Sequence, residues 1–180
     1  MPRKHWPSGA GILGRMAQSS EGIVQRLAAL GLRLAAALSF LAPLLTRVVI
    51  GIAFHFTGHG KLQNLDRTTQ FFSSLGIPFP AFNAFFVSWL EFAGGIFLIL
   101  GLGTRIFAGL LSISMTVALL TSDGKDLIQK FPTGDATDVT SFTFLLFLIW
   151  LVLYGPGPIS IDKLLSKWLH IGEQPKAGAR

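Results

Sequence analysis

Residues 81–100 read AFNAFFVSWLEFAGGIFLIL, an apolar run that contains a single charged side chain, Glu91. A helix of about 20 residues, rising 1.5 Å per residue, crosses the roughly 30 Å hydrocarbon core of a bilayer. A run of this length and composition predicts a transmembrane helix. The fold is therefore expected to be set by the membrane rather than by a core that excludes water.

Other apolar runs extend this interpretation to the rest of the chain; they cover residues 43–60, 104–121 and 139–154. Pro43 suits the first turn of a helix, where its missing N–H costs little. The last run is short, and it stops at residues 155–158, Gly-Pro-Gly-Pro, which a helix does not cross. The sequence thus predicts an all-α fold, an integral membrane four-helix bundle over residues 43–165.

The segment before the first span is apolar but carries charges. In residues 25–42, Arg26 and Arg33 lie seven positions apart and so share one helical face. This pattern predicts an N-terminal amphipathic interfacial helix that leads into the first span, with a fifth span over residues 27–45 as the alternative. Residues 1–24 are basic and rich in Gly and Ser, which is typical of a disordered segment or of a mitochondrial transit peptide.

The two long loops differ in polarity. Residues 64–75 predict a short helix that ends at Gly76 and Pro78, two positions that we interpret as structural. The phenylalanines in and around this helix make it too apolar for a free loop, so it is expected to pack against the bundle or the membrane interface. Residues 122–138 contain four aspartates and are expected to form a polar loop.

The distribution of basic residues predicts the orientation of the chain. Lys and Arg gather in the N-terminal flank, at Arg105 between the second and third spans, and in the tail 166–180. With four spans these segments share one side of the membrane, and basic segments stay in the cytoplasm. Both termini are therefore expected to be cytoplasmic. Arg105 is interpreted as a topology anchor, and Lys61, in the other set of loops, as a structural or topology residue.

The composition excludes several classes of function. The chain is 51% hydrophobic and only 13% charged, against about 25% charged residues in typical soluble domains. Cysteine is absent, which excludes disulfides, thiolate metal sites and thiol catalysis. The net charge of +6 follows the ends of the apolar runs rather than one face, so nucleic acid is not an expected partner. No phosphate loop, nucleophile triad or dinucleotide-binding pattern indicates a cofactor held by this chain.

Glu91 is the most informative single residue. It lies about ten residues into its span and hence near the bilayer centre, where a carboxylate is costly. Ser88 and Gly95 share its helical face, and small residues there allow a second helix to approach closely. Glu91 is therefore expected to carry a proton or to contact a ligand, with a purely structural ion pair as the alternative.

The first span supplies candidate partners for Glu91. Arg47, Gly51, His55 and His59 follow one another at steps of four and form a stripe along the helix. Counting depth from the ends of both spans places Gly51 level with Glu91, so that Arg47 and His55 each come within reach of it. We expect these residues to form a polar bundle interior, although Arg47 is long enough to reach the headgroups instead.

The spacing of His55 and His59 also suits two ligands to one metal ion. A third protein ligand would be needed, and only Glu91 is placed to serve. No metal site is therefore expected, and hydrogen bonding to the polar headgroup of a ligand is the favoured role for the histidines.

Several short segments together resemble the DoxX family of small bacterial membrane proteins. They are residues 47–51 (RVVIG), 56–62 (FTGHGKL), 75–78 (LGIP), 90–95 (LEFAGG), 98–105 (LILGLGTR) and 154–162 (YGPGPISID). Their order and spacing carry the resemblance, which covers Arg47 to Leu165. The chain differs from the family before the fourth span, where family members often carry Gly-Gly and a Glu. This chain has Gly134 and Asp135 there, with Asp138 nearest the Glu position, so no role for that carboxylate carries over.

The resemblance implies four transmembrane helices in a bacterial inner (plasma) membrane and a link to redox metabolism. Some relatives resemble subunits of quinol oxidases or thiosulfate:quinone oxidoreductases, others belong to oxidative-stress complexes, and more distant ones are assembly factors. The expected function is a redox-linked subunit of a membrane oxidoreductase complex, with quinone as its candidate ligand and redox subunits or further copies as candidate partners in the bilayer. The alternative is a non-enzymatic accessory or assembly factor, and whether the chain is itself an enzyme stays open. A transporter is less well supported, because matched broken helices are not evident.

Overall fold

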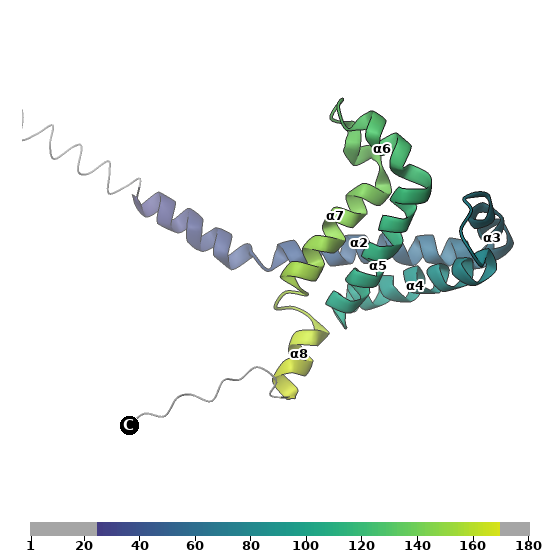
Figure 1. Cartoon of the computed structure of the whole chain (residues 1–180). Coiled ribbons are helices and arrows are strands. Elements are labelled where there is room, and N and C mark those ends of the chain that lie inside the picture. The colour runs from purple at the N-terminus through teal and green to yellow at the C-terminus, as the bar shows by residue number, and fades with distance from the viewer. Residues whose placement is uncertain (1–24, 170–180) are drawn as a thin grey trace, which may run out of the picture. The chain divides into compact units, whose positions relative to one another are not determined.

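A computed structural model describes residues 25–169, and every regular element in that range is a helix, which confirms the all-α fold (Figure 1). The chain divides into two compact units, Met1–Ser39 and Phe40–Arg180. In the first unit, residues 25–38 are helical and their leucines are exposed. The interfacial role of this helix stays a prediction, and the disorder expected for residues 1–24 falls outside the described residues.

The second unit contains four long helices joined by shorter ones. The long helices are α2 (Leu41–Gln63), α4 (Pro80–Leu100), α5 (Thr104–Ala118) and α7 (Thr140–Tyr154). The shorter elements are α3 (Leu65–Ser74), the π-helix η1 (Leu119–Asp123), α6 (Gly124–Lys130), the 3-10 helix η2 (Asp135–Asp138) and α8 (Ile161–Trp168). The long helices match the apolar runs of the sequence, because backbone groups in hydrocarbon must be hydrogen-bonded within the segment.

Three helical stretches within residues 25–169 are long and apolar enough to cross a membrane. They are Gln25–Gln63, which contains α2, then Pro80–Leu100 and Thr104–Lys130. Helix α7 is equally apolar but has 15 residues, fewer than the roughly 20 that a typical crossing needs. A fourth crossing by α7 therefore stays a prediction.

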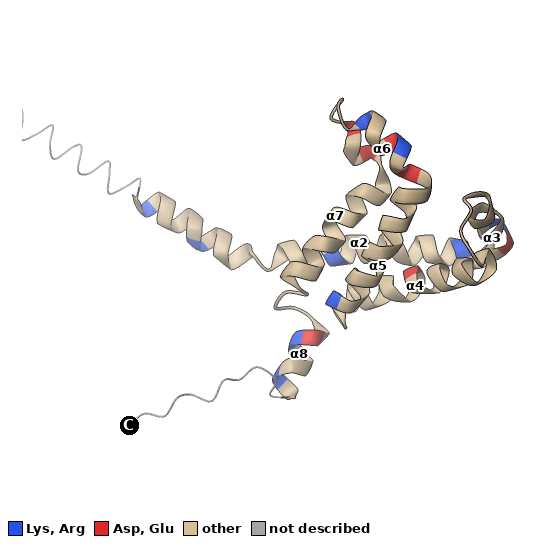
Figure 2. Cartoon of the chain, in the orientation of Figure 1, with Lys and Arg blue, Asp and Glu red and all other residues tan. Residues whose placement is uncertain are grey.

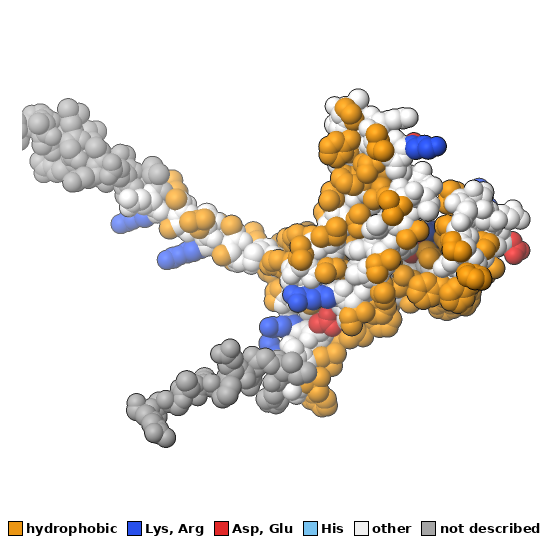
Figure 3. Space-filling model, in the orientation of Figure 1, with side chains coloured by type: hydrophobic (Ala, Val, Ile, Leu, Met, Phe, Trp, Pro, Cys, Tyr) orange, Lys and Arg blue, Asp and Glu red, His pale blue; other side chains and the backbone are white. Residues whose placement is uncertain are grey.

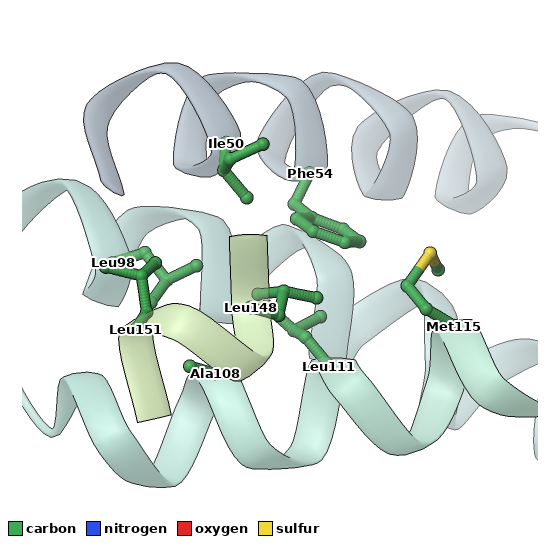
Figure 4. Packing of buried hydrophobic residues seen from close by; sticks show 8 residues of the cluster. All are labelled: Ile50, Phe54, Leu98, Ala108, Leu111, Met115, Leu148 and Leu151. Carbon is green, nitrogen blue, oxygen red and sulfur yellow. The ribbon is translucent and has the colours of Figure 1, made fainter. Parts of the chain in front are cut away.

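The long helices pack as two pairs, α2 with α4 and α5 with α7 (Figure 1). Side chains from all four meet in one buried cluster, shown in Figure 4: Ile50, Phe54, Leu98, Ala108, Leu111, Met115, Leu148 and Leu151. Lipid tails are as apolar as these side chains, so close van der Waals packing rather than exclusion of water stabilises such contacts in a bilayer.

The two loops between the long helices are largely helical. The short helix expected over residues 64–75 is present as α3, which packs on α4. The expectation of a polar loop over residues 122–138 is wrong, because α5 continues through the π-helix into α6 and is followed by η2. The aspartates in this segment suggested a loop, but Asp126 is exposed on α6, and Asp135 and Asp138 are exposed on η2, so short helical turns accommodate them.

Charged and apolar side chains occupy different parts of the second unit. Lys, Arg, Asp and Glu concentrate on α3, α6 and α8 and are sparse along the long helices (Figure 2). Hydrophobic side chains cover much of the visible surface of α4, α5 and α7 (Figure 3). Residues as large as Phe82 and Ile113 are more than 60% exposed. A surface of this kind is suited to lipid rather than water.

The predicted orientation can be tested with reporter fusions. A reporter fused after Lys167 should read as cytoplasmic, and one inserted near Gly134, in the exposed turn before η2, should read as external. Alkaline phosphatase and green fluorescent protein give opposite signals on the two sides and serve as mutual controls. A cytoplasmic signal at Gly134 would contradict the four-span topology.

Candidate functional site

Glu91 is buried in the middle of α4 and forms an ion pair with Lys61. The Lys61 Nζ atom lies 2.6 Å from Oε1 and 2.7 Å from Oε2 of Glu91, so it donates to both carboxylate oxygens. The Glu91 side chain is 1% exposed, whereas that of Lys61 is 30% exposed. Glu91 is thus enclosed in the protein, whereas part of the Lys61 side chain lies at the protein surface.

The structure pairs Glu91 with Lys61 rather than with Arg47 or His55. Glycines in α2 let its backbone touch that of α4: a Cβ atom at Gly51 would lie 2.7 Å from the Gly95 oxygen. Gly51 is therefore level with Gly95, about 6 Å along α4 from Glu91. Counting residues from the ends of both spans had placed Gly51 level with Glu91. That count was wrong because the first turns of α2 extend past the end of α4.

The Lys61–Glu91 pair lines a cavity of about 990 Å³, which we call the Lys61–Glu91 cleft. Its walls come from the second half of α2, from α3, from the first half of α4 and from the end of α5 with the π-helix. The lining is mostly apolar and includes Phe71, Phe72, Leu75, Phe86, Leu90 and Met115. A mostly apolar cavity with a few converging polar groups is the usual form of a small-molecule site.

Helix α3 forms one wall of the cleft with Arg67, Thr68, Phe71 and Phe72. The turn that follows it fixes the start of α4. Gly76 has φ +72°, in the left-handed region where glycine is free of strain. The Pro78 carbonyl accepts a hydrogen bond of 2.6 Å from Asn83 Nδ2. Both residues thus lie where the chain turns from the cleft wall into α4.

Asp123 adds a second carboxylate to the cleft lining and was not singled out from the sequence. It is the last residue of the π-helix and accepts hydrogen bonds from Ser122, at 2.6 Å, and from Ser141 on α7. Isolated π turns within α-helices are frequent at functional sites. No sequence signal identifies a π turn, so Asp123 could have been found only as one of several loop aspartates.

The two histidines lie outside the lining of this cleft. The His55 ring packs on Phe92 at a centroid distance of 4.6 Å, and its Nδ1 is 3.5 Å from the Phe92 carbonyl. The rings of His55 and His59 are nearly parallel at 6.4 Å, and His59 Nε2 is 3.1 Å from Gln63 Nε2. Within residues 25–169, no group of three His, Cys, Asp or Glu side chains is arranged to hold a metal ion.

Arg47 lies at the opposite end of α2 from Lys61 and is 2% exposed. Its Nη1 donates to the Pro156 carbonyl at 2.7 Å, and its Nη2 donates to the Ile159 carbonyl. The guanidinium thus holds the Gly-Pro-Gly-Pro segment against α2. It is bound within the protein, at a distance from Glu91 that the sequence did not predict.

Asp162 completes the attachment of the C-terminal segment. Its two carboxylate oxygens accept hydrogen bonds from the backbone N–H groups of Gly103, at 2.6 Å, and Thr104, at 3.0 Å, at the start of α5. Its own N–H donates to the Gly101 carbonyl at 2.9 Å. A carboxylate at a helix N-terminus satisfies free N–H groups there, so Asp162 acts as a cap supplied from another helix. The role follows from a contact between distant segments, which the sequence does not reveal.

Arg105 has a looser environment. It is exposed, and its Nη2 atom lies 3.4 Å from the Leu153 carbonyl at the end of α7. Its role as a topology anchor stays a prediction.

Comparison with known proteins identifies a family for this chain. The family model named DoxX matches residues 42–124, which include α2 to α5 and the Lys61–Glu91 pair. The chain is 33% identical over 129 residues to "Putative oxidoreductase CatD" of Bacillus subtilis (strain 168), a match that covers 71% of this chain and 89% of that protein. No solved structure matches the chain.

Two inner membrane proteins of Escherichia coli (strain K12) are also similar to this chain. YqjF is 33% identical over 132 residues, or 69% of this chain and 92% of YqjF. YphA is 30% identical over 128 residues, or 67% of this chain and 87% of YphA. The matches cover most of each relative, and the apolar helices agree with their description as membrane proteins. The chain is therefore a membrane protein that belongs to the DoxX family.

Proposed function

We propose that this DoxX-family protein is a redox-linked membrane subunit that binds a quinone, or a similarly lipid-soluble redox molecule, in the Lys61–Glu91 cleft. The observation that carries the proposal is the position of a buried, charge-paired carboxylate in the wall of a large apolar cavity. An ionisable residue within a membrane segment is a functional candidate by default. One relative, CatD, bears a name that describes an oxidoreductase.

The chemistry of the cleft suits a quinone headgroup. The Lys61 ammonium group can donate a hydrogen bond to a quinone carbonyl, and the Glu91 carboxylate can accept one from a quinol hydroxyl. The apolar lining, with Phe71, Phe86 and Leu90, suits the ring and the isoprenoid tail. Reduction of a quinone takes two electrons and two protons. The electrons would come from a partner subunit, and the ion pair would exchange protons at the headgroup.

A second candidate, a non-enzymatic accessory or assembly factor, is favoured by one feature of the same pair. Lys61 binds both oxygens of Glu91, so the ion pair is complete without a ligand. In that case the pair fixes the register of α2 against α4, and the exposed apolar helices contact partner subunits.

Purification from native membranes separates these functions. We expect about one quinone per chain by mass spectrometry of extracted lipids, since a built site retains its ligand. Glu91→Gln keeps the shape of the side chain and most hydrogen bonds, and the partly exposed Lys61 remains hydrated. This variant should therefore melt within a few degrees of the unsubstituted protein but lose the bound quinone.

Glu91→Ala serves as the packing control in the same detergent. It should lose both the quinone and stability, because it also leaves a cavity in α4. Protein that carries no quinone, combined with equal destabilisation of both variants, would support the accessory function. A stable Glu91→Gln protein with full quinone content would contradict the proposed role of the carboxylate.

A further inference from the structure

Helix α8 has two chemically distinct faces. Ile161, Leu164, Leu165 and Trp168 follow the spacing i, i+3, i+4 and i+7, so they share one face of the helix. Lys163 and Lys167 lie four positions apart on the polar side. This pattern is typical of a helix that lies in the interface between membrane and water, with its apolar side towards the acyl chains.

Most of the apolar face of α8 is exposed. Leu164 is 67% exposed and Leu165 is 39% exposed, whereas Ile161 at the start of this face is half-buried. Lys163 and Lys167 on the polar side are exposed as well. Figure 3 shows hydrophobic side chains of this region at the surface, and Figure 2 shows blue residues on α8. In water, the exposed apolar area of Leu164 and Leu165 would be costly, at about 25 cal/mol per Å².

The position of α8 is fixed by contacts to the long helices. The Ser160 side chain caps its first turn by accepting from the Lys163 N–H at 3.1 Å. Asp162 in that first turn binds the start of α5, and Arg47 holds the residues just before it. Helix α8 is therefore held at the start of α5, six residues after the end of α7.

We propose that α8 binds the anionic lipid surface of the adjoining leaflet, with Leu164 and Leu165 among the acyl chains and Lys163 and Lys167 at lipid phosphates. The choice of lipid rests on charge complementarity, because basic residues near an anionic surface favour binding. It also rests on continuity, because α7, the predicted fourth span, ends at Tyr154 and only six residues separate it from α8. This binding does not depend on what the Lys61–Glu91 cleft holds.

The test uses the cysteine-free chain, in which one introduced thiol is the only labelling site. Leu164→Cys and, as an exposed reference in η2, Thr137→Cys are placed separately in the full-length protein, in nanodiscs of phosphatidylcholine alone or with phosphatidylglycerol. Labelling by a membrane-impermeant maleimide is then timed. At Leu164→Cys it should be at least about thirtyfold slower than at Thr137→Cys in the anionic discs, since only the first thiol is covered by lipid.

Neutralising both lysines separates the charge from the apolar contact. Lys163→Gln with Lys167→Gln should speed labelling at Leu164→Cys by about thirtyfold in anionic discs, or fivefold per lysine, and leave it unchanged in phosphatidylcholine. Equal labelling of the two thiols would overturn membrane binding by α8. A slow Leu164→Cys rate that does not respond to lipid charge or to the lysines, or that depends on the number of protein copies per disc, would assign this face to a protein partner and overturn the proposal.

Discussion

Gly58→Ala is expected to lower the free energy of unfolding by about 1–3 kcal/mol. A Cβ atom at Gly58 would lie 2.8 Å from both the Ser88 oxygen and the Phe92 Cα atom, and closer still to the Phe92 N atom. These are backbone atoms, which cannot rotate away as a flexible side chain can. The α2–α4 pair must therefore separate, and much of its close packing would be lost.

Gly60→Ala is the matched control for this substitution. Gly60 lies two residues further along α2 and has no atom within 4 Å of its Cβ position. Alanine is favoured over glycine inside a helix by about 0.5–1 kcal/mol, so this variant should be slightly stabilised. Denaturant titration of both variants in one detergent measures the difference. Equal effects at the two positions would contradict the close backbone contact between α2 and α4.

Arg47→Met is expected to cost about 3 kcal/mol of stability. The substitution keeps most of the apolar stem but removes the hydrogen bonds to the Pro156 and Ile159 carbonyls. A hydrogen bond made by a charged group contributes about 1.5–3 kcal/mol, and Arg47 makes two of them from a buried position. The C-terminal segment should then detach from α2, and protease cleavage after Lys163 or Lys167 should become faster.

Arg105→Met provides the comparison for Arg47. Arg105 is exposed and makes a single long hydrogen bond at 3.4 Å, so its loss should change the stability by less than about 0.5 kcal/mol. Thermal melts of the two variants, with trypsin digestion at the same temperature, show the difference. An Arg47→Met protein that melts and is cleaved like Arg105→Met would contradict the role of Arg47 in holding the C-terminal segment.

The helices were predictable because the membrane imposes a simple rule on the sequence. An apolar run such as residues 81–100 must form its backbone hydrogen bonds within the segment, and a helix does so. Composition and length are therefore enough to find α4. The π-helix that ends at Asp123 was not predictable, since no pattern of residue types marks such a turn. Helix α8 was overlooked, although the spacing of Ile161, Leu164 and Leu165 was visible in the sequence.

The ion-pair partner of Glu91 could not be predicted from the positions of the apolar runs alone. The axial register of α2 against α4 is set by close contacts at Gly51 and Gly58, which lie seven positions apart on one face. That spacing was a usable signal, and it would have moved Glu91 away from Arg47 and towards Lys61. The attachments of Arg47 and Asp162 could not be foreseen, because their partners are backbone groups in distant segments.

We propose that the Lys61–Glu91 cleft, and not the histidine face of α2, binds the quinone. Equilibrium titration of a short-chain quinone into delipidated protein, followed by fluorescence quenching, measures the Kd directly. We expect Glu91→Gln and Lys61→Met each to weaken binding by about tenfold or more, because each removes a charged hydrogen-bonding partner. His55→Gln, outside the cleft lining, should leave the Kd unchanged. Binding that is lost in His55→Gln and retained in Glu91→Gln would contradict this account.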